Sequence, residues 1–271
     1  MTGDAAGNVT GNVTGTDELL FQREGAIATI TFNRPQARNA MTWAMYEGLV
    51  GACEQVDADD GIRVLVLRGA GDKAFVAGTD ITQFRDFEGP ADGHAYEERL
   101  DRIVGRLESV RIPTVAVVDG YAVGGGMSLA AACDLRIATP GAKFGIPIAR
   151  TLGNCLSMDT YARLVSLLGP ARTLHLIYTA SFLDGQQALA AGLVSELVEP
   201  EELDERTQEL TEQLASHAPL TMRVTKQAVH RLRTACLPDG DDLVATCYGS
   251  ADFAEGVRAF TEKRKPEWTG R

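Results

Sequence analysis

The sequence is poor in the residues and patterns that metal, disulfide and membrane functions require. It has four histidines and five cysteines, and no two cysteines form a CxxC pair, so neither a zinc site nor a disulfide framework is expected. No apolar run approaches the ~18 residues of a membrane helix, and the first residues lack the basic start and apolar stretch of a signal peptide. These absences predict a cytoplasmic protein with reduced thiols and no metal.

Basic charge is scarce as well. The chain has 26 Lys and Arg residues against 37 Asp and Glu residues, a formal net charge of −11. Such a surface repels phosphate backbones, so we expect neither a nucleic-acid nor a membrane partner. Apolar residues make up 45% of the chain, an ordinary share that excludes a disordered or fibrous protein. A chain of 271 residues can therefore bury a substantial core.

Hydrophobic patterning predicts an α/β protein with largely parallel strands. Short apolar runs at 64–67 and 114–118 are typical of strands buried on both faces, and helical spacing of apolar residues follows each region. Further expected elements are strands at 26–32 and 135–138 and helices at 45–56, 127–133, 161–168, 171–178, 185–191, 201–217 and 219–233. Residues 1–17, rich in Gly, Thr and Asn, predict a disordered tail because they offer little to bury.

Two glycine-containing loops share one design. The strand at 64–67 leads to Ala77-Gly78-Thr79-Asp80, and the strand at 114–118 leads to Gly124-Gly125-Gly126; a helix-like stretch follows each loop. A helix start presents unpaired backbone N–H groups, and its dipole favours negative charge. Two such groups aimed at one point would form an oxyanion hole. The alternative is that these glycines only make tight turns.

A serine hydrolase is a second hypothesis. Gly126-Met127-Ser128-Leu129-Ala130 approximates the GxSxG nucleophile elbow, although its last position is Ala. Ser128 would be the nucleophile, and His175, His217 or His230 would have to supply the base. The GxGxxG, P-loop, HExxH and EF-hand motifs are absent.

Five segments carry a family resemblance, in this order along the chain: TFNRPQARNAM (31–41), KAFVAGTDI (73–81), DGYAVGGGMSLAAACDLRIATPGAKFGIP (119–147), TASFLDGQQALAAGLVSELV (179–198) and EGVRAFTEKRKPEW (255–268). Together they resemble the crotonase superfamily, the enoyl-CoA hydratase/isomerase family. The resemblance implies a crotonase-like spiral of repeated ββα units over 18–200 and a C-terminal helical trimerisation region over 201–271. It also implies trimers or dimers of trimers, an acyl-CoA substrate that brings the coenzyme A, and no permanently bound cofactor.

The resemblance also assigns site residues. The backbone N–H groups of Thr79 and Gly125 would hold the thioester oxygen. Substrate-binding and CoA-binding positions would be Arg34, Ala37, Arg38, Ala77, Asp80, Ile81, Tyr121 and Lys263. Independently of the family, Asp80 is expected to cap the following helix.

The chain departs from the hydratase pattern at the two glutamates that activate water. Ser128 and Ile148 occupy their positions, and neither side chain can act as a general acid or base of tuned pKa. The family would make this chain an enoyl-CoA hydratase, yet we expect weak or absent crotonyl-CoA hydration. Decarboxylation of a malonyl-type CoA ester is an alternative, because it needs only an oxyanion hole and a proton source. A non-catalytic CoA-binding protein is another.

Two segments contain polar residues that could replace the missing glutamates. Cys155, Ser157, Asp159 and Tyr161 lie in a divergent loop, and Asp86, Glu88, His94, Glu97 and Glu98 follow the first oxyanion loop. Taken singly, each is expected to be solvated or structural, because such residues are mostly exposed. Asp159 is the one retained as a catalytic candidate.

Overall fold

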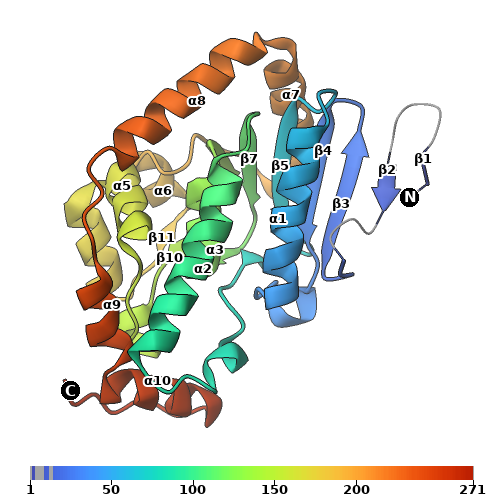
Figure 1. Ribbon diagram of the computed structural model, residues 1–271. Coiled ribbons are helices and arrows are strands. Elements are labelled where there is room, and N and C mark those ends of the chain that lie inside the picture. The colour runs from blue at the N-terminus through green and yellow to red at the C-terminus, as the bar shows by residue number, and fades with distance from the viewer. Residues whose placement is uncertain (1, 4–8, 12–14, 271) are drawn as a thin grey trace.

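Two sheets organise the protein (Figure 1), and the computed structural model describes residues 2–3, 9–11 and 15–270. The larger sheet has the order β1-β2-β3-β4-β5-β7-β9-β12, and the smaller has the order β11-β10-β8-β6. Strands of the larger sheet are β1 (Thr2–Gly3), β2 (Val9–Gly11), β3 (Leu19–Glu24), β4 (Ile27–Phe32), β5 (Val64–Gly69), β7 (Thr114–Val118), β9 (Leu135–Ala138) and β12 (Glu196–Leu197). Those of the smaller sheet are β6 (Ala74–Val76), β8 (Tyr121–Val123), β10 (Lys143–Gly145) and β11 (Leu183–Asp184).

The helices are distributed between the strands and the C-terminal third. The α-helices are α1 (Trp43–Ala58), α2 (Pro90–Glu108), α3 (Gly125–Ala132), α4 (Ile148–Thr151), α5 (Met158–Tyr178), α6 (Gly185–Ala190), α7 (Leu203–Ser216), α8 (Pro219–Thr234), α9 (Asp241–Tyr248) and α10 (Ala251–Thr261). Short 3₁₀ helices are η1 (Pro35–Ala37), η2 (Ile81–Phe84) and η3 (Pro200–Glu202). In α5, Gly169 has non-helical backbone angles before Pro170, which explains the break between the two helical patterns of the sequence.

A repeated ββα unit builds the core and confirms the predicted spiral. β5, β7 and β9 each lie in the larger sheet, and each is followed by a strand of the smaller sheet (β6, β8, β10) and then by a helix (α2, α3, α4). The strands β4, β5, β7, β9 and β12 pair in parallel, as the patterning predicts. Repetition therefore places the ends of β6, β8 and β10 next to one another.

The apolar strands are buried on both faces. Leu65 and Leu67 of β5 face the main core with α1 and α3, whereas Val64 and Val66 join a second core that includes Leu203 of α7. Alternate side chains of a strand point to opposite faces, so a strand covered on both sides reads as a continuous apolar run. Burial of both faces is the physical reason for the pattern seen in the sequence.

The N-terminal segment differs in part from the expected tail. Residues 9–11 form β2, which pairs antiparallel with β3, and residues 2–3 pair with β2. The rest of this prediction, over residues 1, 4–8 and 12–14, lies outside the described part of the chain.

The C-terminal helices run in two directions from the core (Figure 1). α8 (orange) crosses one end of the molecule and packs on α5, whereas α9 and α10 return along α2 to the opposite end. There Phe84, Tyr96, Tyr248 and Phe253 form an aromatic cluster, with the Tyr248 and Phe253 ring centroids 4.7 Å apart. The C-terminal segment thus folds back over its own core. No helix of the described residues is long and apolar enough to cross a membrane.

Candidate active site

The two glycine-containing loops leave neighbouring strands. β6 and β8 pair in parallel, so their carboxyl ends lie at one edge of the smaller sheet, and the loops that carry Thr79 and Gly125 begin there. A methyl group added to Gly125 would lie 3.7 Å from the amide nitrogen of Thr79. The structure therefore brings together the two backbone groups that the sequence singled out.

Both amides are available to a ligand. On one side of Thr79, the carbonyl of Gly78 accepts from the N–H of Met41 at 2.8 Å; on the other, Asp80 N–H donates to the carbonyl of Met41 at 2.9 Å. This pattern turns the Thr79 N–H away from Met41. The second amide belongs to Gly125, the first residue of α3, where a backbone N–H has no partner within the helix. Among the described residues, neither amide donates a hydrogen bond. Two adjacent free donors can stabilise an oxyanion.

Each glycine of the second loop is required for a different structural reason. Gly124 has a φ of +54°, a conformation that other residues rarely adopt. A methyl group on Gly125 would lie 2.7 Å from the hydroxyl of Tyr46, and one on Gly126 would overlap the carbonyl of Val76. The triple glycine therefore permits the turn, the open donor position and the close packing of α3 on β6.

Two tyrosines hold the side chain of Thr79. Its hydroxyl lies 2.9 Å from the hydroxyl of Tyr46 and 3.0 Å from that of Tyr96. Burial raises the pKa of Tyr46 to about 12 and also raises the pKa of Tyr96, so both hydroxyls stay neutral at physiological pH. This chain of hydroxyls fixes the loop that presents the first amide.

A cavity of about 400 Å³ opens beside the two amides. Its lining includes these residues expected from the sequence: Ala37, Arg38, Ala77, Thr79, Asp80, Ile81, Gly125, Ser128 and Ile148. Arg34, Tyr121, Asp159 and Lys263 are outside the lining. The volume suits the acyl portion of a small-molecule ligand.

Two residues expected to bind substrate or CoA also support the loops. The guanidinium of Arg34 donates to the carbonyl of Ala40 at 2.8 Å and pairs with Asp80 at 3.1 Å. Asp80 caps η2 as predicted, accepting from the N–H of Thr82 at 3.2 Å. Burial opposes ionisation of Asp80, but the bonds from Thr82 and Arg34 prevail and lower its pKa. Arg34 and Asp80 therefore lock the first loop in place.

Tyr121 and Lys263 lie at exposed positions. The Tyr121 ring is 5.9 Å from the guanidinium carbon of Arg38 and makes an edge contact with Phe182, with centroids 6.1 Å apart. Lys263 follows α10, the helix that contributes Phe260 to the cavity lining.

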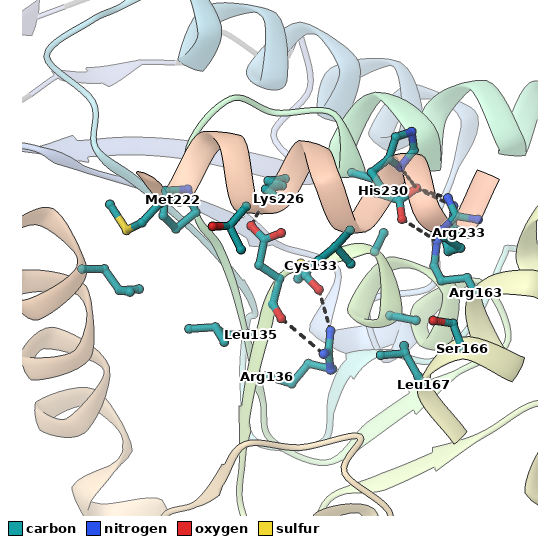
Figure 2. Close-up of a pocket in the computed structure, with 18 of the residues that line it drawn as sticks. Cys133, Leu135, Arg136, Arg163, Ser166, Leu167, Met222, Lys226, His230 and Arg233 are labelled. Atoms are coloured by element: carbon teal, nitrogen blue, oxygen red, sulfur yellow. Dashed lines mark hydrogen bonds and ion pairs between the residues drawn. The ribbon is translucent and has the colours of Figure 1, made fainter. Parts of the chain in front are cut away.

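Asp159 belongs to a buried ion-pair cluster. It pairs with Arg163 and, at 2.6 Å, with Arg233, and Arg163 also pairs with Glu108 at 2.9 Å. Burial opposes the charge, but the two arginines lower the pKa of Asp159. Figure 2 shows Arg163 and Arg233 beside His230, at one side of a second cavity of about 430 Å³ under α8. The cluster joins α8 to α5, and the structure does not bring Asp159 to the oxyanion loops.

Ser128 lacks the partner that a nucleophile needs. Its hydroxyl donates to the carbonyl of Gly124 at 3.4 Å, and no histidine is among the residues that line the cavity. His175 and His217 are exposed, and His230 lies in the cluster at α8. A serine hydrolase activates its nucleophile through an adjacent base, so the structure gives no support to that hypothesis.

Glu97 lines the cavity, although the sequence names it only among several possible replacements for the missing glutamates. Taken singly it is expected to be solvated or structural, and the structure shows that it is not solvated, because the residue is only 5% exposed. A signal was present: Glu97 and Tyr96 stand three and four residues before Leu100, on the stripe that continues through Ile103 and Leu107 into the core. Residues spaced in this way share one helix face.

The comparisons with known proteins agree with this geometry. A model of the enoyl-CoA hydratase/isomerase family matches residues 22–271. The chain belongs to this family.

Individual relatives differ in the reactions their names describe. The chain is 33% identical over 256 residues to a short-chain enoyl-CoA hydratase from Clostridium acetobutylicum, covering 93% of this chain and 97% of that protein. A solved enoyl-CoA hydratase/carnithine racemase from Magnetospirillum magneticum is 34% identical with a TM-score of 0.77, covering 94% and 97% of the two chains. A methylmalonyl-CoA decarboxylase in complex with 2-nitronate-propionyl-CoA is 29% identical with a TM-score of 0.87, covering 94% and 99%. The family therefore acts on CoA thioesters and includes more than one reaction.

Proposed function

We propose that this chain binds an acyl-CoA thioester with its carbonyl oxygen between the amides of Thr79 and Gly125 and stabilises the enolate. The observation that carries the proposal is the pair of free amide donors side by side at the wall of a cavity. Amides held rigidly in a site sheltered from water stabilise a developing oxyanion strongly. Coenzyme A enters as part of the substrate, with Arg38 and Lys263 as its expected cationic contacts.

Hydration is not the reaction we propose. Ser128 donates to a backbone carbonyl, and Ile148 is a buried apolar residue in the cavity wall. Neither can position and activate water at a carbon–carbon double bond. Crotonyl-CoA hydration is expected to stay well below the ~10 s⁻¹ of a typical enzyme, and turnover at or above that rate would contradict this part of the proposal.

Decarboxylation of a malonyl-type CoA ester is the second candidate. A methylmalonyl-CoA decarboxylase shares the fold with a TM-score of 0.87 at 29% identity, which motivates this candidate. The hydratase/carnithine racemase, with a TM-score of 0.77, is 34% identical, so the choice rests on the chemistry of the residues. In this reaction the Cα–carboxylate bond breaks, carbon dioxide leaves, and the electron pair remains in the enolate until a proton reaches Cα. The substrate supplies its own leaving group, so two glutamates are not required.

The test is a mass-spectrometric screen of enoyl-, malonyl-, methylmalonyl- and hydroxyacyl-CoA esters. A Gly125→Pro variant removes one donor N–H and should lose turnover by 10²-fold or more. Unchanged turnover in a folded Gly125→Pro variant would refute the oxyanion hole, and binding without turnover would favour a CoA-binding protein.

We further propose that the chain self-associates, as a trimer or a dimer of trimers, through α8. This helix has no buried residue, and Leu220, Val224, Val229 and Leu232 are exposed, Leu232 by 81%. Figure 2 shows α8 above the second cavity, with Met222 and Lys226 directed to the core side. Apolar residues gathered on one exposed helix are typical of an interface. Light scattering should give a trimer or larger mass, and Leu232→Glu should lower it.

A further inference from the structure

The cavity beside the two amides contains a carboxyl group that the proposed function has not yet used. We propose that Glu97 is the catalytic acid–base of this site and transfers a proton to and from the α-carbon of the bound acyl thioester. This inference rests on the proposed function, because it requires a thioester held at Thr79 and Gly125.

The helix that supports the oxyanion loop also carries this carboxyl. Tyr96, whose hydroxyl lies 3.0 Å from the hydroxyl of Thr79, precedes Glu97 directly in α2. Glu97, Thr79, Gly125 and Ile148 line the same cavity. Glu97 therefore borders the same cavity as the two residues whose amides are free, and a displacement of α2 would move both Glu97 and the support of Thr79.

Its hydrogen bonds come from neutral donors. The Tyr248 hydroxyl donates to Oε1 at 2.6 Å, and the Ser157 N–H donates to Oε2 at 3.0 Å. In the part of the chain that the structure describes, no Lys, Arg or His forms an ion pair with Glu97. Glu108 is built differently, because it pairs with Arg163 and Arg233. A structural carboxylate gains from an adjacent cation, whereas a group that must exchange a proton needs both of its states accessible.

The surroundings of Glu97 hold its pKa near the middle of the physiological pH range. Burial raises the pKa of Glu97 to about 7, against the opposing bond from Tyr248, and Asp101 raises it further. Among the described residues, the titratable groups that influence or are influenced by this carboxyl are Tyr46, Tyr96, Asp101, Cys155, Tyr161, Cys247 and Tyr248. None of them is a cation, so both protonation states are populated near neutral pH.

The chemistry balances in both directions. In exchange of the α-hydrogens with solvent, the Glu97 carboxylate takes a proton from Cα. The electron pair of that C–H bond moves into the thioester enolate, whose oxygen the two amides hold. Return of a solvent-derived proton to Cα restores the thioester. In decarboxylation, carbon dioxide leaves with cleavage of the Cα–carboxylate bond, and the Glu97 carboxyl gives its proton to Cα. Water then supplies the next proton to Glu97. No oxidant, reductant or metal is needed.

The test is the exchange of α-hydrogens of butyryl-CoA in D₂O, followed by mass spectrometry. The wild-type chain should exchange them, and Glu97→Gln should lower the rate by 10²-fold or more, because a positioned acid–base contributes at least that much. The affinity for butyryl-CoA, measured by calorimetry, should change less than threefold. The adjacent Glu98→Gln is the matched control, because Glu98 is exposed, and it should exchange like the wild type.

The outcomes separate the inference from the proposed function. Exchange that persists in Glu97→Gln would overturn the role of Glu97 and leave the oxyanion hole standing. Binding by the wild type without exchange would also overturn that role. A wild type that does not bind butyryl-CoA would overturn the proposed function and the inference with it.

A second measurement does not require Glu97→Gln to fold. The wild-type exchange rate should rise with pH through a midpoint near 7, because the carboxylate is the base. Tyr248→Phe removes the donor to Oε1 and should move the midpoint to higher pH. A midpoint that does not move would overturn the inference.

Discussion

Burial of Glu97 also predicts how the stability of the protein depends on pH. The carboxyl has a pKa of about 7 in the folded chain, against a reference value of 4.5, and burial is the largest cause. The folded state therefore keeps a proton that the unfolded state releases between these values. By linkage, the free energy of unfolding falls as pH rises through this window and levels off above pH 7.

The size of this effect follows from the difference between the two values. A rise from 4.5 to about 7 corresponds to about 3 kcal/mol of lost stability, at about 1.4 kcal/mol for each pH unit. Glutamine has nearly the same shape and no charge, so Glu97→Gln removes the penalty at high pH. At pH 5 the Glu97 carboxyl of the folded wild type is mostly protonated. The substitution therefore raises the free energy of unfolding much less at pH 5 than at high pH.

Urea unfolding of the wild type and of Glu97→Gln at pH 5 and pH 8 measures this difference. The gain from the substitution should be about 2–3 kcal/mol larger at pH 8 than at pH 5. Glu98→Gln, one residue away on the exposed face of α2, should show the same small effect at both pH values. An equal effect of Glu97→Gln at the two pH values would refute the argument that this carboxyl is buried without a compensating cation.

Three further substitutions test other parts of the structure. Tyr46→Phe removes a hydroxyl 2.9 Å from that of Thr79 and should lower turnover about tenfold in the acyl-CoA assay, with a loss of stability near 1 kcal/mol. Arg163→Met leaves the buried Glu108 with fewer cations and should cost about 3–5 kcal/mol in urea unfolding. Gly105→Ala lies in α2 with open space beside it and should raise stability by about 0.5–1 kcal/mol, seen as a higher melting temperature with turnover unchanged.

The parts of the fold that sequence predicted best are those with the strongest periodic signal. The runs 64–67 and 114–118 are strands buried on both faces, and α7 and α8 begin and end within two residues of the expected helices. The short strands β6, β8 and β10 were missed, because three residues are too few to show alternation. These strands also position the site. Hydrophobic patterning therefore predicted the core strands, whereas only the structure shows the smaller sheet from which the two loops leave.

The sequence indicates a helix-like stretch after the loop at 77–80 but not the bounds of α2, for a different reason. The mean hydropathy of α2 is low and its first turns contain Gly, Asp, His and two glutamates, so apolar spacing does not show where the helix begins. Tyr96 and Glu97 are buried because η2, α9 and α10 close over them, and Tyr248 of α9, which donates to Glu97, lies about 150 positions further along the chain. A single sequence without an alignment carries no record of such a contact.

The backbone part of the site and its side-chain part were therefore predictable to different degrees. Gly78 and Gly124–Gly126 predict exposed amides because glycine allows the positive φ angles and close backbone approach that these loops require. A carboxyl has no local reason to be buried, and its role depends on what packs around it.

The same difference explains how the chemistry of such a site can change. The amides of Thr79 and Gly125 follow the ends of β6 and β8, and the chain of hydroxyls from Tyr46 to Tyr96 holds Thr79. Position 128 contacts this frame through the Gly124 carbonyl, which accepts from the backbone N–H of Ser128 at 3.1 Å, a bond that does not depend on the side chain. A change of side chain at position 128 or 148 therefore leaves the two amides in place. A proton-transfer group can come from any element that borders the cavity, and the proposed one in this chain is Glu97 of α2, which Tyr248 holds. In this proposal the backbone of the ββα units stabilises the charge, and the side chains that pack against it decide the reaction.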